Sequence, residues 1–112
     1  MSRSAFGLQP LWCLLILLPA LAGCGSRELK IDIAPTYGDI NRIIVQPKCV
    51  RCHVSLSTYD GLMAIVHSNQ ADTSRFYQVV SEGEMPMQSP PLSTKEVTAI
   101  RDWINSGASS SP

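Results

Sequence analysis

The sequence predicts a small all-α domain, and three observations support this prediction. Apolar residues recur at helical spacing in several segments between Tyr37 and Ala108. Residues that favour helix ends, including a capping box, bound these segments. In the same region no convincing alternation of apolar and polar residues, the pattern typical of strands, is present. The chain is also short, since 112 residues allow one small domain and little more.

The N-terminus has the pattern of an export signal. Arg3 supplies a positive charge, residues 11–18 (LWCLLILL) are apolar, and residues 21–24 (LAGC) place a cysteine after small residues. Even extended to Cys24, the apolar run of about fourteen residues is shorter than the roughly twenty that cross a bilayer. LAGC resembles the bacterial lipobox, so we expect a signal peptide at 1–23 and a lipid on Cys24. An ordinary secretory signal with an incidental cysteine is the alternative.

This assignment limits what the cysteines can do. Cys13 leaves with the signal and Cys24 carries the lipid, so the folded domain retains only Cys49 and Cys52. A structural zinc site would need two further ligands at similar spacing, and only the distant His67 is available. Zinc is therefore a poor candidate for this pair.

Size and charge narrow the function further. Removing 23 of 112 residues leaves 89, with eight Lys and Arg (nine less Arg3) against nine Asp and Glu, a formal charge near −1. Nucleic-acid binding would call for a clustered basic face, which this balance does not favour. A domain this small has difficulty burying enough apolar surface, so a stabilising cross-link or cofactor is expected.

The first part of the mature chain predicts a tether and then a helix. We expect residues 24–36 to be an anchor and tether, with a short edge strand at 29–33 as the alternative. Asp39 is the predicted N-cap of a helix that Pro47 ends just before Cys49. The residues at helical spacing on its apolar face are Ile40, Ile43 and Ile44.

Two short helices are predicted after residue 53. The first begins near Ser57 or Thr58, and its inward residues are Leu62, Ile65 and Val66. The second is capped by Asp72 and ends at Gly83, where a left-handed residue is wanted. Its shared apolar face consists of Phe76, Val79 and Val80.

A proline-rich loop and a longer helix complete the predicted domain, which spans residues 37–108. The loop is GEMPMQSPP, and Ser93 with Glu96 forms the capping box that opens the last helix. Gly107 closes this helix, and residues 109–112 are predicted to be a disordered tail. The apolar stripe of the helix consists of Val97, Ile100, Trp103 and Ile104.

The motif CVRCH, Cys49 to His53, carries the chemistry. Two thiols at this spacing can add to two vinyl groups of one porphyrin, and His53 can reach the iron. A thioredoxin-like dithiol would need a preceding strand, and here a helix and a proline precede the motif. A structural disulfide is also possible in an extracytoplasmic compartment. The export signal favours haem attachment, which takes place outside the cytoplasm.

A methionine in the proline-rich loop is the predicted second axial ligand. Methionine sulfur binds haem iron and raises its reduction potential relative to a second imidazole. Met85 lies at the start of the loop and is preferred over Met87, which is expected to line the haem crevice. Met63 lies in an apolar helical run and is expected to pack. His67 is expected at a helix end in solvent.

A helix, then C-x-x-C-H, then a loop with G-x-M-P and a helix ending W-I-x-x-G-A together resemble a small monohaem cytochrome c domain. The resemblance is closest to the compact type of this domain, which is found in many bacterial lipoproteins and in planctomycete-type multidomain proteins. The resemblance implies a compact class I-like cytochrome c fold wrapped around one covalently attached haem c. It also implies thioether attachment at Cys49 and Cys52, and iron ligation by His53 and Met85. The near-neutral charge and the second methionine, Met87, depart from the family pattern.

The resemblance implies an electron carrier rather than an enzyme. We expect an extracytoplasmic cytochrome, in the periplasm or at the cell surface, that is tethered to a membrane by lipid and exchanges electrons with donor and acceptor proteins. No general base or substrate pocket is evident in the sequence. The alternative is a haem enzyme or sensor, peroxidase-like or gas-binding, with a displaceable distal ligand. A thiol oxidoreductase without haem is a third possibility.

Overall fold

The computed structural model describes residues 31–112. The predicted signal peptide, the lipidation site at Cys24 and most of the tether lie outside these residues. All regular elements within 31–112 are helical, which confirms the all-α prediction. Residues 31–33, part of the alternative edge strand, have no regular structure. No helix in the described part of the chain is both long and apolar enough to cross a membrane.

The first helix begins three residues earlier than predicted. Thr36, not Asp39, is the N-cap of α1 (Tyr37–Ile40), because Thr36 is extended and its hydroxyl accepts a hydrogen bond from the Asp39 amide at 3.3 Å. Asp39 lies in the first turn, where its carboxylate accepts from the Ala34 amide at 2.9 Å and pairs with Arg42 at 2.8 Å. The carboxylate therefore stabilises the helix start from inside the first turn.

The helix does not end at Pro47, as the sequence predicted. It continues through a π-helical turn, η2 (Asn41–Val45), into α2 (Gln46–Lys48) and contains Pro47. A proline inside a regular helix would clash with the carbonyl four residues earlier, and the wider π turn relieves this clash. The extra residue in the turn also rotates the apolar face, so that Ile40, Ile44 and Val45 are buried while Ile43 is half-buried.

The two middle helices differ from the prediction at one end each, because the first ends at Met63, before the predicted inward residues Ile65 and Val66, and the second does not begin at Asp72. Thr58 caps α3 (Tyr59–Met63), which follows the short helix η3 (Val54–Ser57). The cap position of α4 (Arg75–Ser81) is Ser74 rather than Asp72, which lies inside the short helix η4 (Ala71–Thr73). The buried Ser74 hydroxyl accepts from the His67 amide at 2.8 Å and so holds the preceding turn together.

The last helix matches its sequence signals. Both hydrogen bonds of the capping box open α5 (Thr94–Asn105): the Glu96 amide donates to Ser93 Oγ at 3.2 Å, and the Ser93 amide donates to Glu96 Oε2 at 2.8 Å. Gly83 and Gly107 have the positive φ predicted for the residues that follow α4 and α5. Of the predicted stripe, Ile100, Trp103 and Ile104 are buried and Val97 is half-buried.

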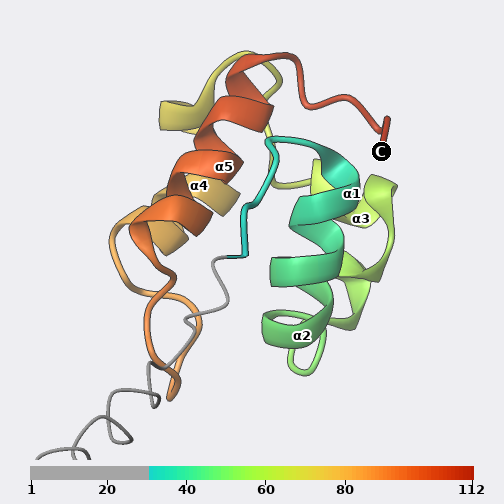
Figure 1. Cartoon of the computed structure of the whole chain (residues 1–112). Helices are drawn as coiled ribbons and strands as arrows, with labels where there is room; N and C mark the ends of the chain where they lie inside the picture. The colour runs from blue at the N-terminus through green and yellow to red at the C-terminus, as the bar shows by residue number, and fades with distance from the viewer. Residues whose placement is uncertain (1–30) are drawn as a thin grey trace, which may run out of the picture. The chain divides into compact units, whose positions relative to one another are not determined.

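A cluster of three aromatic side chains, one each from α1, α3 and α5, joins these helices. The rings of Tyr37 and Tyr59 meet edge to face at 5.1 Å, and Trp103 packs beside Tyr37. The Tyr59 hydroxyl donates to the Ala108 carbonyl at 2.7 Å, and Trp103 Nε1 donates to the Ser109 carbonyl at 2.9 Å. In Figure 1, α4 and α5 lie on one side, and α1, α2 and α3 on the other. A cavity is lined by residues of both groups of helices.

Candidate functional site

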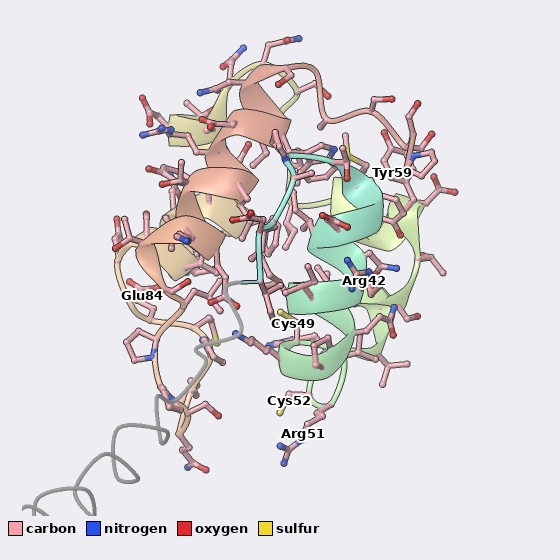
Figure 2. All side chains as sticks on the ribbon, viewed as in Figure 1. Arg42, Cys49, Arg51, Cys52, Tyr59 and Glu84 are labelled. Carbon is pink, nitrogen blue, oxygen red and sulfur yellow. The ribbon has the colours of Figure 1, made fainter. Side chains whose placement is uncertain are left out.

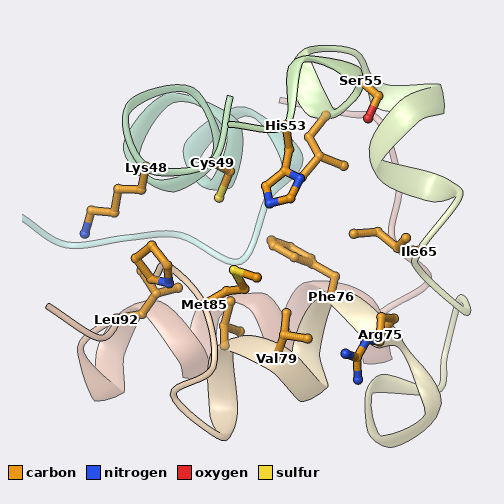
Figure 3. A pocket seen from close by; sticks show the side chains of 13 residues that line it. Lys48, Cys49, His53, Ser55, Ile65, Arg75, Phe76, Val79, Met85 and Leu92 are labelled. Atoms are coloured by element: carbon orange, nitrogen blue, oxygen red, sulfur yellow. The ribbon is translucent and has the colours of Figure 1, made fainter. Parts of the chain in front are cut away.

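A cavity of about 840 Å³, counting the part open to solvent, lies between the CVRCH turn and α4. The space that a water-sized molecule can occupy is about 260 Å³, and the mostly apolar lining is typical of small-molecule and cofactor sites. Figure 3 shows the side chains that line it. The lining residues are Lys48, Cys49, His53, Ser55, Leu56, Ile65, Arg75, Phe76, Val79, Val80, Met85, Pro86 and Leu92.

The end of the first helix presents Cys49 and His53 to this cavity. Cys49 is the C-cap of α2, and its amide donates to the Val45 carbonyl at 2.9 Å. The chain then turns tightly, since the amides of Cys52 and His53 both donate to the Cys49 carbonyl, at 3.2 and 2.9 Å. In Figure 3, Cys49 and His53 point into the cavity from the same wall. The turn therefore places the first thiol and the imidazole side by side.

Cys52 lies outside the cavity. Its side chain is exposed at the tip of the turn beside Arg51 (Figure 2), and neither Cys49 nor Cys52 forms a disulfide. The structure therefore brings Cys49, His53 and Met85 together at one cavity and leaves the fourth predicted residue at its outer edge. Attachment of one haem to both thiols requires the Cys52 side chain to turn toward the cavity.

The two methionines of the proline-rich loop differ in their surroundings. Met85 lines the cavity, and its amide donates to the Val79 carbonyl at 3.0 Å, which holds the loop against α4. Its side chain points toward His53 from the opposite wall (Figure 3). Met87 is 67% exposed and does not line the cavity. The expectation that Met87 lines the crevice therefore does not agree with the structure, because beyond Pro86 the chain leads the side chain into solvent.

Met63 and His67, which were not predicted to be ligands, lie away from the cavity. Met63 is half-buried and packs against the hydrophobic core. His67 is exposed, and its Nδ1 lies 3.0 Å from the Thr73 hydroxyl. His53 is thus the histidine that lines the cavity.

Two cations that no sequence motif singled out also line the cavity. Lys48 pairs with the buried Glu96, and Arg75 pairs with Glu84 at 3.5 Å. Burial acts to raise the pKa of Glu96, but hydrogen bonds from Lys48 and the Ser93 amide, with the charge of Lys48, hold this pKa below its usual value. Lys48 and Glu96 are 48 positions apart, so no local sequence signal could have paired them.

The environment of Cys49 disfavours a reactive thiolate. Burial raises the pKa of the Cys49 thiol, and the nearby Lys48 charge opposes this only in part. Attacking thiols of dithiol oxidoreductases have lowered pKa values, often at a helix N-terminus, whereas Cys49 follows a helix C-terminus. The local electrostatics therefore do not favour the thiol oxidoreductase alternative.

The donor set at the cavity fits the chemistry of haem. One thiol, one imidazole and one thioether share an apolar cavity, and these are the groups that attach and ligate haem c. Within residues 31–112, no three His, Cys, Asp or Glu side chains gather as a metal cluster. The site therefore offers an imidazole and a thioether on facing walls as its candidate iron ligands.

Comparisons with known proteins do not assign the chain to a family. No protein-family model matches the chain, and no curated protein or solved structure is significantly similar to it.

Proposed function

We propose that this protein binds one haem c in the cavity and acts as an extracytoplasmic electron carrier. The observation that supports this most directly is the position of His53 and Met85 on opposite walls of one apolar cavity, with Cys49 beside His53. Imidazole and thioether on opposite sides are the axial ligands of electron-transfer cytochromes c.

The residues of the cavity have distinct roles in this proposal. Cys49 and Cys52 hold the cofactor through thioether bonds, and His53 and Met85 are the iron ligands. The bound haem supplies reversible one-electron chemistry. The apolar lining, including Phe76 and Leu92, excludes water and disfavours the more highly charged oxidised form, which raises the reduction potential. Redox donor and acceptor proteins are the partners, and Cys24 carries the lipid that anchors the domain to a bacterial membrane.

The proposal is tested by the visible spectrum of the full-length protein after expression together with a haem-maturation system. We expect one haem that survives acid and solvent extraction, because thioether bonds hold it to the chain. A colourless protein with a disulfide between Cys49 and Cys52 would contradict the proposal. A haem protein that binds cyanide or carbon monoxide readily, without any sign of a bound methionine, would support the enzyme or sensor alternative.

A further inference from the structure

Gly61 makes an unusually close contact with the segment that follows His53. A Cβ atom at position 61 would overlap the carbonyl oxygen of Ser55 and lie 2.8 Å from its carbonyl carbon. It would also lie 3.1 Å from the Thr58 hydroxyl. Gly61 lies within α3 and has no left-handed φ, so the need for glycine here is steric. The first turn of α3 can therefore lie against the backbone of η3 only because residue 61 lacks a side chain.

The segment in contact with Gly61 also determines where His53 lies. Ser55 is two residues after His53, and the Leu56 amide donates to the His53 carbonyl at 2.9 Å. Ser55 and Leu56 line the same cavity as His53. A displacement of the Ser55 backbone is therefore transmitted through this short helical turn to His53.

Of the two segments in contact, α3 is the more firmly held. Leu62 is fully buried, and the Tyr59 hydroxyl donates to the Ala108 carbonyl at 2.7 Å. By contrast, η3 lies at the surface, where Val54 is 72% exposed. A side chain at position 61 would therefore displace η3 rather than α3, because the solvent-facing side of η3 leaves this segment room to move.

We infer that Gly61 is a positioning residue for His53: its missing side chain lets α3 hold η3, and η3 holds the imidazole in the cavity. The role in iron ligation rests on the proposed function, whereas the role in holding η3 does not depend on it. The two parts can therefore be tested separately.

The test compares Gly61→Ala with Gly38→Ala in the purified full-length protein. Gly38 is a matched control, because it also lies within a helix and the atom nearest to a Cβ there is Pro112 Cα, at 3.2 Å, without the overlap found at Gly61. In amide-exchange measurements by NMR, the ratio of the Leu56 exchange rate to the rates of the α5 amides in the same sample should be at least about tenfold higher in Gly61→Ala than in the wild type. Gly38→Ala should leave this ratio at the wild-type value. An unchanged ratio in Gly61→Ala would overturn the inference.

The reduction potential is the second measurement. In haem-loaded protein, Gly61→Ala should shift the potential and Gly38→Ala should not, because only the first variant moves His53. A wild-type protein without haem would contradict the proposed function while leaving the exchange result interpretable. Faster Leu56 exchange with an unchanged potential would show that η3 is held by Gly61 but does not position the ligand, which would overturn the inference for His53.

A measurement on the wild type covers the case in which Gly61→Ala fails to fold. If α3 holds η3, the Leu56 amide should open together with the Leu62 amide, which donates to the Thr58 carbonyl at 3.0 Å. Their opening equilibria should then agree within about threefold. A Leu56 amide that opens about a hundredfold more readily than Leu62 would overturn the inference, because η3 would then move independently of α3.

Discussion

Met85 and Met87 show how far two residues of the same type can differ within one loop. Met85 lines the cavity opposite His53, whereas Met87 is 67% exposed. A side chain that is already held in place loses less conformational entropy on binding a metal than an exposed one does. The geometry thus favours Met85 as the ligand.

This difference predicts the behaviour of two single variants. Met85→Ala should abolish the sulfur-to-iron charge-transfer absorption of the oxidised protein and lower its reduction potential, because a thioether ligand favours the reduced iron. Met87→Ala is the control and should keep both properties near wild type, since its side chain lies in solvent. The opposite pattern would assign the ligand to Met87.

At the scale of elements, Glu96 links the last helix to the start of the CVRCH motif. Its carboxylate accepts from the Ser93 amide at the N-terminus of α5 and pairs with Lys48, which directly precedes Cys49. One side chain therefore caps α5 and joins it to α2. Because Lys48 is 37% exposed, solvent screens the ion pair, and the cap should contribute much of the stabilisation.

The lowered pKa of Glu96 predicts a pH dependence of stability. A carboxyl group whose pKa is lower in the folded state than in the unfolded state stabilises the protein at pH values above its unfolded-state pKa. This stabilisation is lost as the pH falls through the folded-state pKa. Glu96→Gln keeps an oxygen that can accept from the Ser93 amide but loses the charge that pairs with Lys48, so it should lower the free energy of unfolding by at most about 1 kcal/mol at pH 7. The loss should be smaller below about pH 4, where an ordinary Glu is itself protonated. Urea unfolding at a series of pH values measures this. Glu82→Gln, at an exposed position, should leave the profile unchanged; an equal loss at all pH values in Glu96→Gln would contradict the assignment.

At the scale of the whole molecule, the cavity separates parts of the chain that a cofactor would join. The CVRCH turn forms one wall, α4 with the following loop forms the other, and the lining between them is mostly apolar. In a domain this small, a bound group that fills such a cavity contributes a large share of the buried apolar surface. The stability of the domain should therefore depend on the attachment residues.

Replacing both Cys49 and Cys52 by alanine should leave a chain with partial helix content, a lower melting temperature and weak protection from hydrogen exchange. Without thioether bonds the proposed haem would no longer be held covalently, and its loss would leave the cavity walls without their apolar contacts. Circular dichroism and hydrogen exchange measure the effect. A double variant as stable as the haem-loaded wild type would show that the cofactor contributes little to the fold.

The proposed lipid anchor at Cys24 lies outside the described residues and is tested on the full-length chain. Cys24→Ser should leave the precursor unprocessed or release the domain into the soluble fraction, because a thioether-linked lipid cannot form on a hydroxyl. Fractionation and mass spectrometry of the N-terminus measure this. A soluble wild-type protein that begins at Cys24 without added mass would contradict the lipobox interpretation.

Sequence alone determined the features of this protein that depend on neighbouring residues. The helical class, the Thr58 cap, the capping box of Ser93 and Glu96, and the left-handed Gly83 and Gly107 all result from hydrogen bonds or steric limits within a few positions. The motif with two thiols and an imidazole is equally local, and its spacing is enough to identify the candidate residues for haem attachment.

Tertiary structure decided which candidate groups meet, and several local predictions also proved wrong. Thr36 and Ser74 replace Asp39 and Asp72 at the helix starts, and a π turn carries the helix through Pro47, because competing hydrogen bonds and packing outweighed intrinsic preference at those positions. The exposure of Cys52, the pairing of Lys48 with Glu96 and the contact of Gly61 with Ser55 depend on how separate segments pack. No pattern within a short window of sequence encodes such contacts, since they form only when the whole domain buries its core.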